Sequence, residues 1–299
     1  MSAGVAGARG WLTDAGKSAG GRLAQGLNTV LGSRAHDRFG ILYYHRICWP
    51  PKHLPRPLLN VDPETFRRQL DGLRRRGFGF MTVGELLETI ERGSSPPPRT
   101  VAVTFDDGFD GVWRFARPVL RDLGIRGTLF VASAFIGSDE PFPFDPWGQT
   151  YASSSEQGVW KPLTWERCAE MVATGELEIG THTHTHADFR GRPQDLFRDI
   201  RTSVETIQER TGVAPTLLSF PYGNVRTGFA GAELAGAARD AGMRCGLTTT
   251  IDLVRAGDDP FGWGRFEASD GDTPATLAAK LGGWYSWMEH GRRILRSVM

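Results

Sequence analysis

The sequence predicts an α/β fold in which a parallel sheet curls into a barrel-like arrangement. From residue 39 onward, short apolar runs alternate with amphipathic segments of helical spacing, which is the pattern of repeated strand–helix units. Carboxylates and histidines directly follow two of these runs, and in such barrels the active residues gather at the carboxyl ends of the strands. The chain of 299 residues is long for one domain but lies within the range of α/β barrels.

The predicted elements alternate regularly along the chain. Strands are expected over residues 40–44, 100–105, 127–131, 178–181, 216–220 and 246–249. Helices are expected over residues 63–76, 83–92, 113–123, 165–174, 193–211 and 228–241. Asp62 is the predicted N-cap of the first helix, and Gly77 follows its end.

Two adjacent carboxylates end the apolar run of residues 101–103. Asp106 and Asp107 stand in the sequence Thr-Phe-Asp-Asp-Gly, residues 104–108. Neighbouring strand residues face opposite ways, so the two carboxylates can reach different atoms of one site. An Asp-Asp-Gly turn that only closes the strand is the alternative.

Three of the seven histidines occupy alternate positions farther along, at His182, His184 and His186. On a strand they would share one face, whereas a turn after Thr181 would let His182 and His186 converge on one point. Two imidazoles and one carboxylate make a three-ligand metal site that leaves positions for water and substrate. Solvated loop histidines are the weaker alternative, so the pattern favours a metal site.

These motifs, in this order, resemble the polysaccharide deacetylases, the carbohydrate esterases of family 4. The resemblance rests on Thr-Phe-Asp-Asp-Gly, on His-Thr-x-x-His after Ile-Gly, and on Phe-Pro-Tyr-Gly at residues 220–223. Further segments similar to bacterial exopolysaccharide or glycan deacetylases are residues 42–46, 66–70, 127–131 and 163–165, so that residues 38–270 are covered. The resemblance implies a distorted, incomplete (β/α) barrel.

The resemblance also implies roles for individual residues. Asp106 would be the catalytic base, and Asp107, His182 and His186 would hold one divalent metal ion, for which zinc is expected. The backbone N–H of Tyr222 would bind the oxyanion. Pro221 and Tyr222 would line the substrate groove, with Trp263 and Arg265 as further substrate-binding candidates.

The chain departs from the family pattern in two places. Ser219 stands where an arginine usually pairs with the base, and the usual late Leu-x-His, which supplies a general acid, is absent. Arg265 could replace the arginine by orienting Asp106, or it could be a surface residue after a turn. For the general acid, His184 and His45 are the candidates; His184 is preferred unless its ring turns away from the pocket.

A long segment, residues 137–163, interrupts the strand–helix repeat. Its aromatic residues could stack on sugar rings or could anchor the segment to the body of the protein, and anchoring is favoured. These residues are Phe142, Phe144, Trp147 and Trp160.

The resulting functional prediction is a metal-dependent hydrolase that removes N-acetyl groups from N-acetylhexosamine units of a bacterial glycan or glycan precursor. One alternative is a carbohydrate-binding protein with the same fold and weak or lost activity. Another is a deformylase or amidohydrolase that acts on a small or lipid-linked substrate. The presence of both Asp106 and Asp107 favours the enzyme, because binding alone would not require two carboxylates.

Composition excludes some other classes of function. With 35 Lys+Arg against 34 Asp+Glu, the net charge of +1 gives no general attraction to nucleic acid or an anionic membrane. The cysteines Cys48, Cys168 and Cys245 are odd in number and scattered, so they predict buried thiols rather than a disulfide framework or a thiolate metal cluster.

Residues 1–37 are rich in Ala and Gly and predict an arm, helical or poorly ordered, ahead of a catalytic domain over residues 38–299. The arm lacks the uninterrupted apolar core of a secretory signal, and nothing approaches the roughly 20 apolar residues of a membrane span. We therefore expect a cytoplasmic protein. A peripheral contact with the inner membrane and the oligomeric state stay open.

Overall fold

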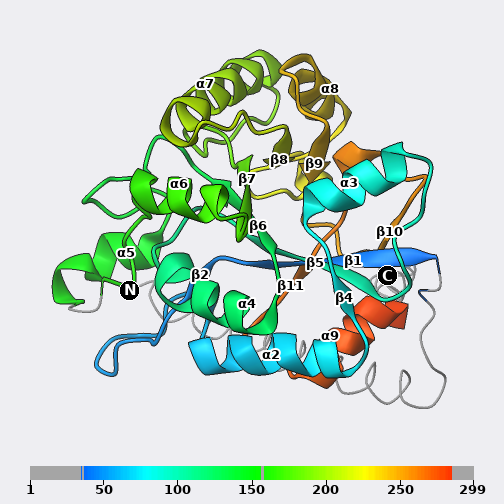
Figure 1. The fold of residues 1–299 in the computed structure, drawn as a ribbon. Coiled ribbons are helices and arrows are strands. Elements are labelled where there is room, and N and C mark those ends of the chain that lie inside the picture. Colours follow the sequence, from blue (N-terminus) through cyan, green and yellow to red (C-terminus); the bar gives the residue numbers. More distant parts are fainter. Residues whose placement is uncertain (1–34, 36, 156–157, 285–299) are drawn as a thin grey trace, which may run out of the picture.

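The computed structural model describes residue 35 and residues 37–155 and 158–284. Most of the predicted arm, His36 and His290 lie outside these described residues. A curled sheet forms the centre of the protein, and helices cover it (Figure 1). No helix in the described part of the chain is long and apolar enough to cross a membrane.

Six parallel strands form the main sheet in the order β1-β5-β6-β7-β8-β9. Their bounds are β1 (Arg38–Tyr44), β5 (Thr100–Phe105), β6 (Gly127–Val131), β7 (Leu177–Thr181), β8 (Leu217–Ser219) and β9 (Cys245–Leu247). Three short strands extend this sheet: β4 (Gly79–Phe80), β10 (Val254–Arg255) and β11 (Phe266–Glu267). A separate pair is formed by β2 (Arg46–Ile47) and β3 (Asn60–Val61).

The two outer parallel strands, β1 and β9, are linked by residues 263–267, which we call the closing segment. At one end Leu247 bridges to Trp263, and Thr248 donates its backbone N–H to the Trp263 carbonyl oxygen at 2.8 Å. At the other end Phe266 pairs with Leu42 of β1. An irregular stretch with a two-residue strand thus spans the gap, which makes the barrel distorted and incomplete, as the sequence predicted.

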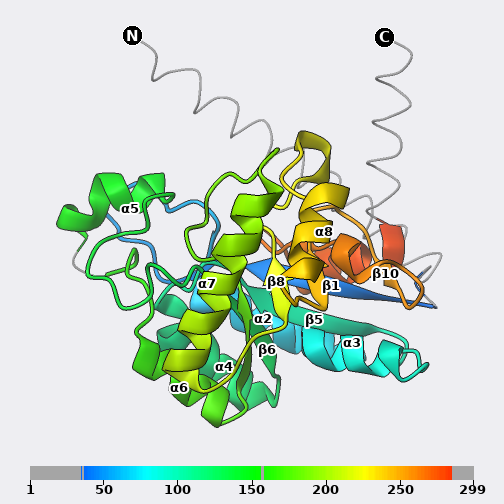
Figure 2. The ribbon, with the colours of Figure 1, turned by 90° about the horizontal axis from the view of Figure 1, so that it is seen from above.

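Both faces of the strands are buried, and this explains their continuous apolar sequences. Leu42, Val103 and Leu129 face one core cluster, whereas their neighbours Ile41, Ala102 and Phe130 face another. Figures 1 and 2 show α7 beside α8 on one flank of the sheet, and Figure 1 shows α2 and α9 together at the opposite end. The helices are α2 (Pro63–Arg75), α3 (Val83–Glu91), α4 (Arg117–Leu123), α5 (Pro146–Tyr151), α6 (Trp165–Ala173), α7 (Pro193–Thr211), α8 (Ala232–Asp240) and α9 (Pro274–Ala279).

The strands over residues 100–105 and 127–131 and the helix over residues 193–211 have the predicted bounds. The helix predicted over residues 113–123 begins instead as a π-helical turn, Val112–Ala116. The helix predicted over residues 228–241 starts only at Ala232, because Gly228 adopts a φ of 84° that ends a preceding 3₁₀ turn. Asp62 occupies the N-cap position, but its side chain makes no capping hydrogen bond.

Candidate active site

The polar residues predicted to form a site do meet at one edge of the sheet. Asp106 and Asp107 follow β5, His182 follows β7, and Tyr222 lies three residues beyond the end of β8. Because these strands are parallel, their carboxyl ends lie at the same edge.

Asp107, His182 and His186 form a buried group whose ligand atoms all lie within 4.8 Å of one another. Oδ1 of Asp107 is 3.4 Å from Nε2 of His182 and 3.7 Å from Nε2 of His186. Nδ1 of His182 is 2.7 Å from the carbonyl oxygen of Ser219. Since a carbonyl oxygen only accepts, Nδ1 carries the proton and Nε2 keeps its lone pair for a metal.

The backbone around this group is in an unusual conformation. Among the described residues, six non-glycine residues have a positive φ, and four of these lie at the site: Asp107, Thr183, His186 and Tyr222. Such conformations cost energy, so the surrounding structure has to hold them in place. Thr183 helps to do so, because its Oγ1 accepts the backbone N–H of His186 at 3.1 Å.

Asp199 of α7 supports the same loop from outside. Its carboxylate accepts the backbone N–H groups of His184 and Thr185 and the hydroxyl of Thr185. The loop that carries the histidines is therefore fastened to a long helix, which restricts the positions that His182 and His186 can take.

Asp106 is paired with Arg265 from the closing segment. The guanidinium donates to both carboxylate oxygens at 2.8 Å, and it also donates to Oγ of Ser219 at 2.9 Å. Arg265 is 0% exposed, so it is not a surface residue after a turn. Burial alone would raise the pKa of Asp106, but the charge and hydrogen bonds of Arg265, together with His182 and His45, hold that pKa below its usual range.

Asp107 has the opposite electrostatic environment. Burial, together with the negative charge of Asp106, raises its pKa well above the usual range. Burial also lowers the pKa of both His182 and His186, which favours the neutral imidazoles that bind metals. A buried carboxylate beside two neutral imidazole nitrogens fits a divalent cation, which would supply the missing positive charge.

The two candidates for the general acid lie in different surroundings. His45 follows β1, and burial lowers its pKa to about 4. The nearby Asp106 acts to raise this pKa, and the nearby His182 acts to lower it further. The ring of His184 instead contacts Oγ of Ser133 at 2.9 Å. The structure therefore brings His45 into the electrostatic environment of Asp106 and leaves His184 in a separate polar contact.

The predicted substrate-binding residues differ in their access to solvent. Tyr222 is 47% exposed, and within the described residues its backbone N–H has no hydrogen-bond acceptor. Pro221 is buried, and Trp263 is only 1% exposed, like Arg265 an interior residue of the closing segment. From these positions Trp263 and Arg265 can shape the site but do not present a surface to a glycan.

Two of the four aromatic residues help to anchor the segment over residues 137–163, as predicted. Phe142 and Trp147 are buried, and Nε1 of Trp147 donates to the carbonyl oxygen of Pro55 at 2.7 Å. Phe144 has a second contact that the sequence did not reveal, because its ring stacks on the imidazole of His186. A further interaction missed at the sequence level is the buried ion pair between Arg46 and Asp145, since no local pattern links two residues 99 positions apart.

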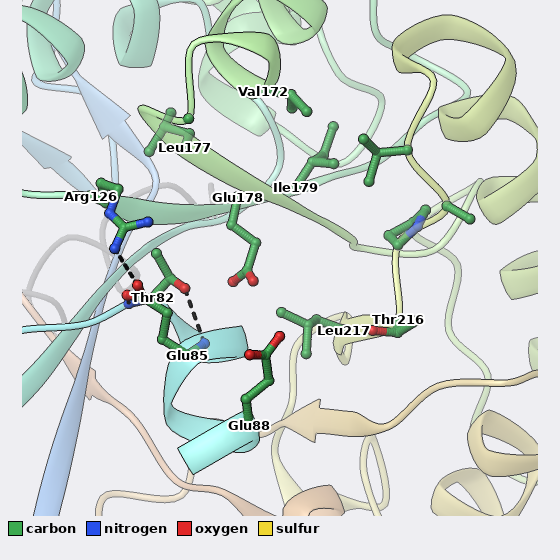
Figure 3. Close-up of a pocket in the computed structure, with 14 residues that line it drawn as sticks. Thr82, Glu85, Glu88, Arg126, Val172, Leu177, Glu178, Ile179, Thr216 and Leu217 are labelled. Atoms are coloured by element: carbon green, nitrogen blue, oxygen red, sulfur yellow. Dashed lines mark hydrogen bonds and ion pairs between the residues drawn. The ribbon is translucent and has the colours of Figure 1, made fainter. Parts of the chain in front are cut away.

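A cavity of about 300 Å³ lies at the other end of β7 from the histidines (Figure 3). The carboxylate of Glu178 accepts the backbone N–H of Gly84 and the hydroxyl of Thr128, each at 2.9 Å. Glu178 thus stabilises the start of α3, and the cavity takes no part in the site.

Comparison with known proteins agrees with this geometry. The family model for polysaccharide deacetylase matches residues 93–246, which is more than half of the chain and includes the aspartate pair and both metal-ligand candidates of the histidine loop. The chain belongs to this family. The prediction of a carbohydrate esterase family 4 hydrolase that acts as a glycan N-deacetylase is thereby confirmed.

The chain is also similar in sequence to individual bacterial proteins. The Bacillus subtilis protein YxkH is 24% identical over 242 residues, which are 81% of this chain and 75% of YxkH. The poly-β-1,6-N-acetyl-D-glucosamine N-deacetylase of Staphylococcus aureus is 21% identical, and the match spans 55% of this chain and about half, 54%, of that enzyme.

Solved structures confirm the fold. IcaB from Ammonifex degensii superimposes with a TM-score of 0.67 at 26% identity, covering 83% of this chain and 98% of IcaB. The deacetylase PplD of Streptococcus pyogenes gives a TM-score of 0.66 at 18% identity, covering 82% of this chain and 98% of PplD.

Proposed function

We propose that this chain uses Asp107, His182 and His186 to hold one divalent ion, which we take to be zinc, and Asp106 as the base that activates water for amide hydrolysis. The observation that carries the proposal is the contrast within one buried site: the carboxylate of Asp106 is neutralised by Arg265, whereas Asp107 faces two neutral imidazoles. When bound, such an ion polarises the amide carbonyl and lowers the pKa of coordinated water, toward about 7 in favourable zinc sites.

Asp106 accepts the proton of the attacking water. Because its pKa lies below the usual range, the carboxylate stays ionised, so it does not have to lose a proton before the reaction. Arg265 orients it through two parallel hydrogen bonds, and Ser219 adds a contact at 3.3 Å. Arg265 thus takes the role of the arginine that the family places two residues before Pro-Tyr.

The backbone N–H of Tyr222 donates a hydrogen bond to the developing oxyanion. This N–H has no acceptor among the described residues, and the left-handed backbone of Tyr222, with a φ of 61°, sets its direction. A preorganised donor of this kind requires no rearrangement when charge develops on the substrate oxygen.

His45 protonates the departing amine. It is the better candidate because its surroundings include Asp106 and His182, whereas the ring of His184 contacts Ser133. His45 is neutral near pH 7, since its pKa is lowered to about 4. The proton that it donates is therefore the one that Asp106 takes from the attacking water, which passes to His45 when negative charge on the substrate raises the pKa of the imidazole.

The proposed substrate is a glycan that contains N-acetylglucosamine. The support comes from the Staphylococcus aureus relative, whose name specifies a poly-β-1,6-N-acetyl-D-glucosamine substrate. Lipid-linked and nucleotide-linked precursors are the competing substrates, and the cytoplasmic location predicted from the sequence stays a prediction.

The proposal is tested by measuring acetate release from poly-β-1,6-N-acetylglucosamine oligomers, other N-acetylated saccharides, and lipid-linked or nucleotide-linked N-acetylhexosamines. The purified protein should release acetate from at least one of these, lose activity with a chelator and regain it with added zinc. An Asp106→Asn protein, prepared in parallel, controls for contaminating hydrolases. Chelator-resistant hydrolysis, or no hydrolysis of any substrate, would contradict the proposal.

A further inference from the structure

One aromatic ring of the segment over residues 137–163 lies directly against a metal-ligand candidate. The rings of Phe144 and His186 are nearly parallel, with an interplanar angle of 22° and centroids 3.8 Å apart. Tyr222 meets the same imidazole edge-on, with centroids 5.0 Å apart. His186 is thus held between aromatic groups that arise from two distant parts of the chain.

The two histidines of the site differ in how their second ring nitrogen is held. Nδ1 of His182 contacts the carbonyl oxygen of Ser219 at 2.7 Å. Nδ1 of His186 is buried and has no hydrogen-bond partner in any other described residue. A metal-ligating histidine normally donates this N–H to a carboxylate or carbonyl, which fixes the orientation of its ring. His186 lacks that restraint, so its ring has to be oriented by packing.

Phe144 is itself held firmly. Its ring stacks on the buried Phe142, with centroids 5.1 Å apart. The next residue, Asp145, forms an ion pair with Arg46, and these two side chains are only 8% and 2% exposed. Arg46 also donates to the carbonyl oxygen of Val159 at 2.9 Å, so it fastens the segment at two points. A buried ion pair with satisfied partners restricts the geometry of the groups it joins.

We propose that Phe144 is a positioning residue that orients His186 for metal binding by ring stacking, in place of the hydrogen bond that orients His182. The inference rests on the proposed metal role of Asp107, His182 and His186. The Phe144 side chain has no atom that can ligate a metal or transfer a proton; it acts through the imidazole that it contacts. The Arg46–Asp145 ion pair holds the segment in the position in which the rings of Phe144 and His186 stack.

The test compares Co²⁺ binding by the metal-free full chain in three forms: the unmodified protein, Phe144→Leu and Tyr151→Leu. Co²⁺ is used because its visible absorption reports ligand geometry independently of hydrolysis. Tyr151 is a half-buried aromatic residue of the same segment that packs on Trp147, away from His186. Phe144→Leu should weaken Co²⁺ binding about tenfold and change the visible spectrum. Tyr151→Leu should leave both unchanged.

Phe144→Tyr keeps the ring and should restore the affinity and the spectrum. Thermal unfolding of each metal-free protein reports folding, and Phe144→Met replaces Phe144→Leu if the latter does not fold. Unchanged binding and spectrum in a folded Phe144 variant without the ring would overturn the inference, and so would equal losses in Phe144→Leu and Tyr151→Leu. Failure of the unmodified protein to bind Co²⁺ would instead overturn the metal assignment of the proposed function.

Discussion

Asp106 and Asp107 are neighbours in the sequence, yet the two halves of the site that contain them are built differently. The Asp106 half carries its own positive charge, because Arg265 donates to both carboxylate oxygens. The Asp107 half contains two imidazoles whose pKa values are lowered by burial, and it offers no comparable cationic partner among the described residues. The difference between the halves is that the first holds its carboxylate ionised through Arg265, whereas the second has the donor set that the proposed metal ion would complete.

Removing the imidazoles should have the largest effect on the Asp107 half. His182→Ala and His186→Ala should each lose most of the bound metal, because two donors in place of three hold a divalent ion weakly, and hydrolysis should be lost with it. Elemental analysis of the purified proteins checks the prediction. His184→Ala is the matched control and should keep its metal, since its ring contacts Ser133 instead. Unchanged metal content in the His182 and His186 variants would refute the assignment.

His45 belongs to the Asp106 half of the site. His45→Gln should lower turnover by on the order of 10² to 10⁴ while the metal content stays normal, because the leaving amine loses its proton donor. The measurement is kcat, its pH profile and the metal content of the variant. Near-normal rates and pH profiles in both His45→Gln and His184→Ala would show that another group is the acid.

Arg265 tests the charge balance of the Asp106 half. Arg265→Met leaves a buried carboxylate without its partner, which should destabilise the fold by about 3–5 kcal/mol and slow hydrolysis, because the base is no longer oriented. The acid limb of the kcat/KM profile should move to higher pH, because the pKa of Asp106 rises when the guanidinium is removed.

Arg265→Lys keeps the charge but loses the bidentate geometry, so its effects should be smaller. Denaturant unfolding and the pH profile of kcat/KM report the two effects separately. An acid limb that does not move in Arg265→Met would argue against a charge effect of Arg265 on Asp106.

The smallest of the expected effects is the one that replacing His45 has on the pH dependence of the free energy of unfolding. Burial lowers the pKa of His45 from 6.5 to about 4, so between these values the unfolded chain binds more protons than the folded one. The contribution of His45 to the free energy of unfolding therefore rises with pH across this window and falls as the pH drops through it. In metal-free protein, urea unfolding should depend less steeply on pH in His45→Gln than in the unmodified chain; equal slopes would contradict the lowered pKa.

The residues at strand ends were predicted better from the sequence than the contacts that irregular segments make with them. Asp106, Asp107, His182 and His186 follow buried strands, and because parallel strands end at a common edge, their meeting follows from the strand–helix repeat. The strand over residues 100–105 and its aspartates were placed correctly for this reason. The resemblance to the family added the positions of the other motifs along the chain, such as Phe-Pro-Tyr-Gly at residues 220–223.

Contacts between distant irregular segments could not be predicted in the same way. Arg265 lies 159 residues from Asp106 in a closing segment without strand periodicity, so its pairing stayed one of two alternatives. The stacking of Phe144 on His186 depends on how a long segment folds back onto the site, which its Pro-rich and aromatic composition does not specify. Residues 1–37 and the predicted domain boundary stay predictions.

The division of labour between the two aspartates is tested most directly by the metal content of Asp106→Asn and Asp107→Asn, measured side by side with hydrolysis. Asp106→Asn should keep the metal of the unmodified protein and lose activity, because an amide cannot accept the proton of water. Asp107→Asn should lose metal and activity together, because the carboxylate ligand is gone. Equal metal loss in both variants, or loss in Asp106→Asn alone, would contradict the separate roles.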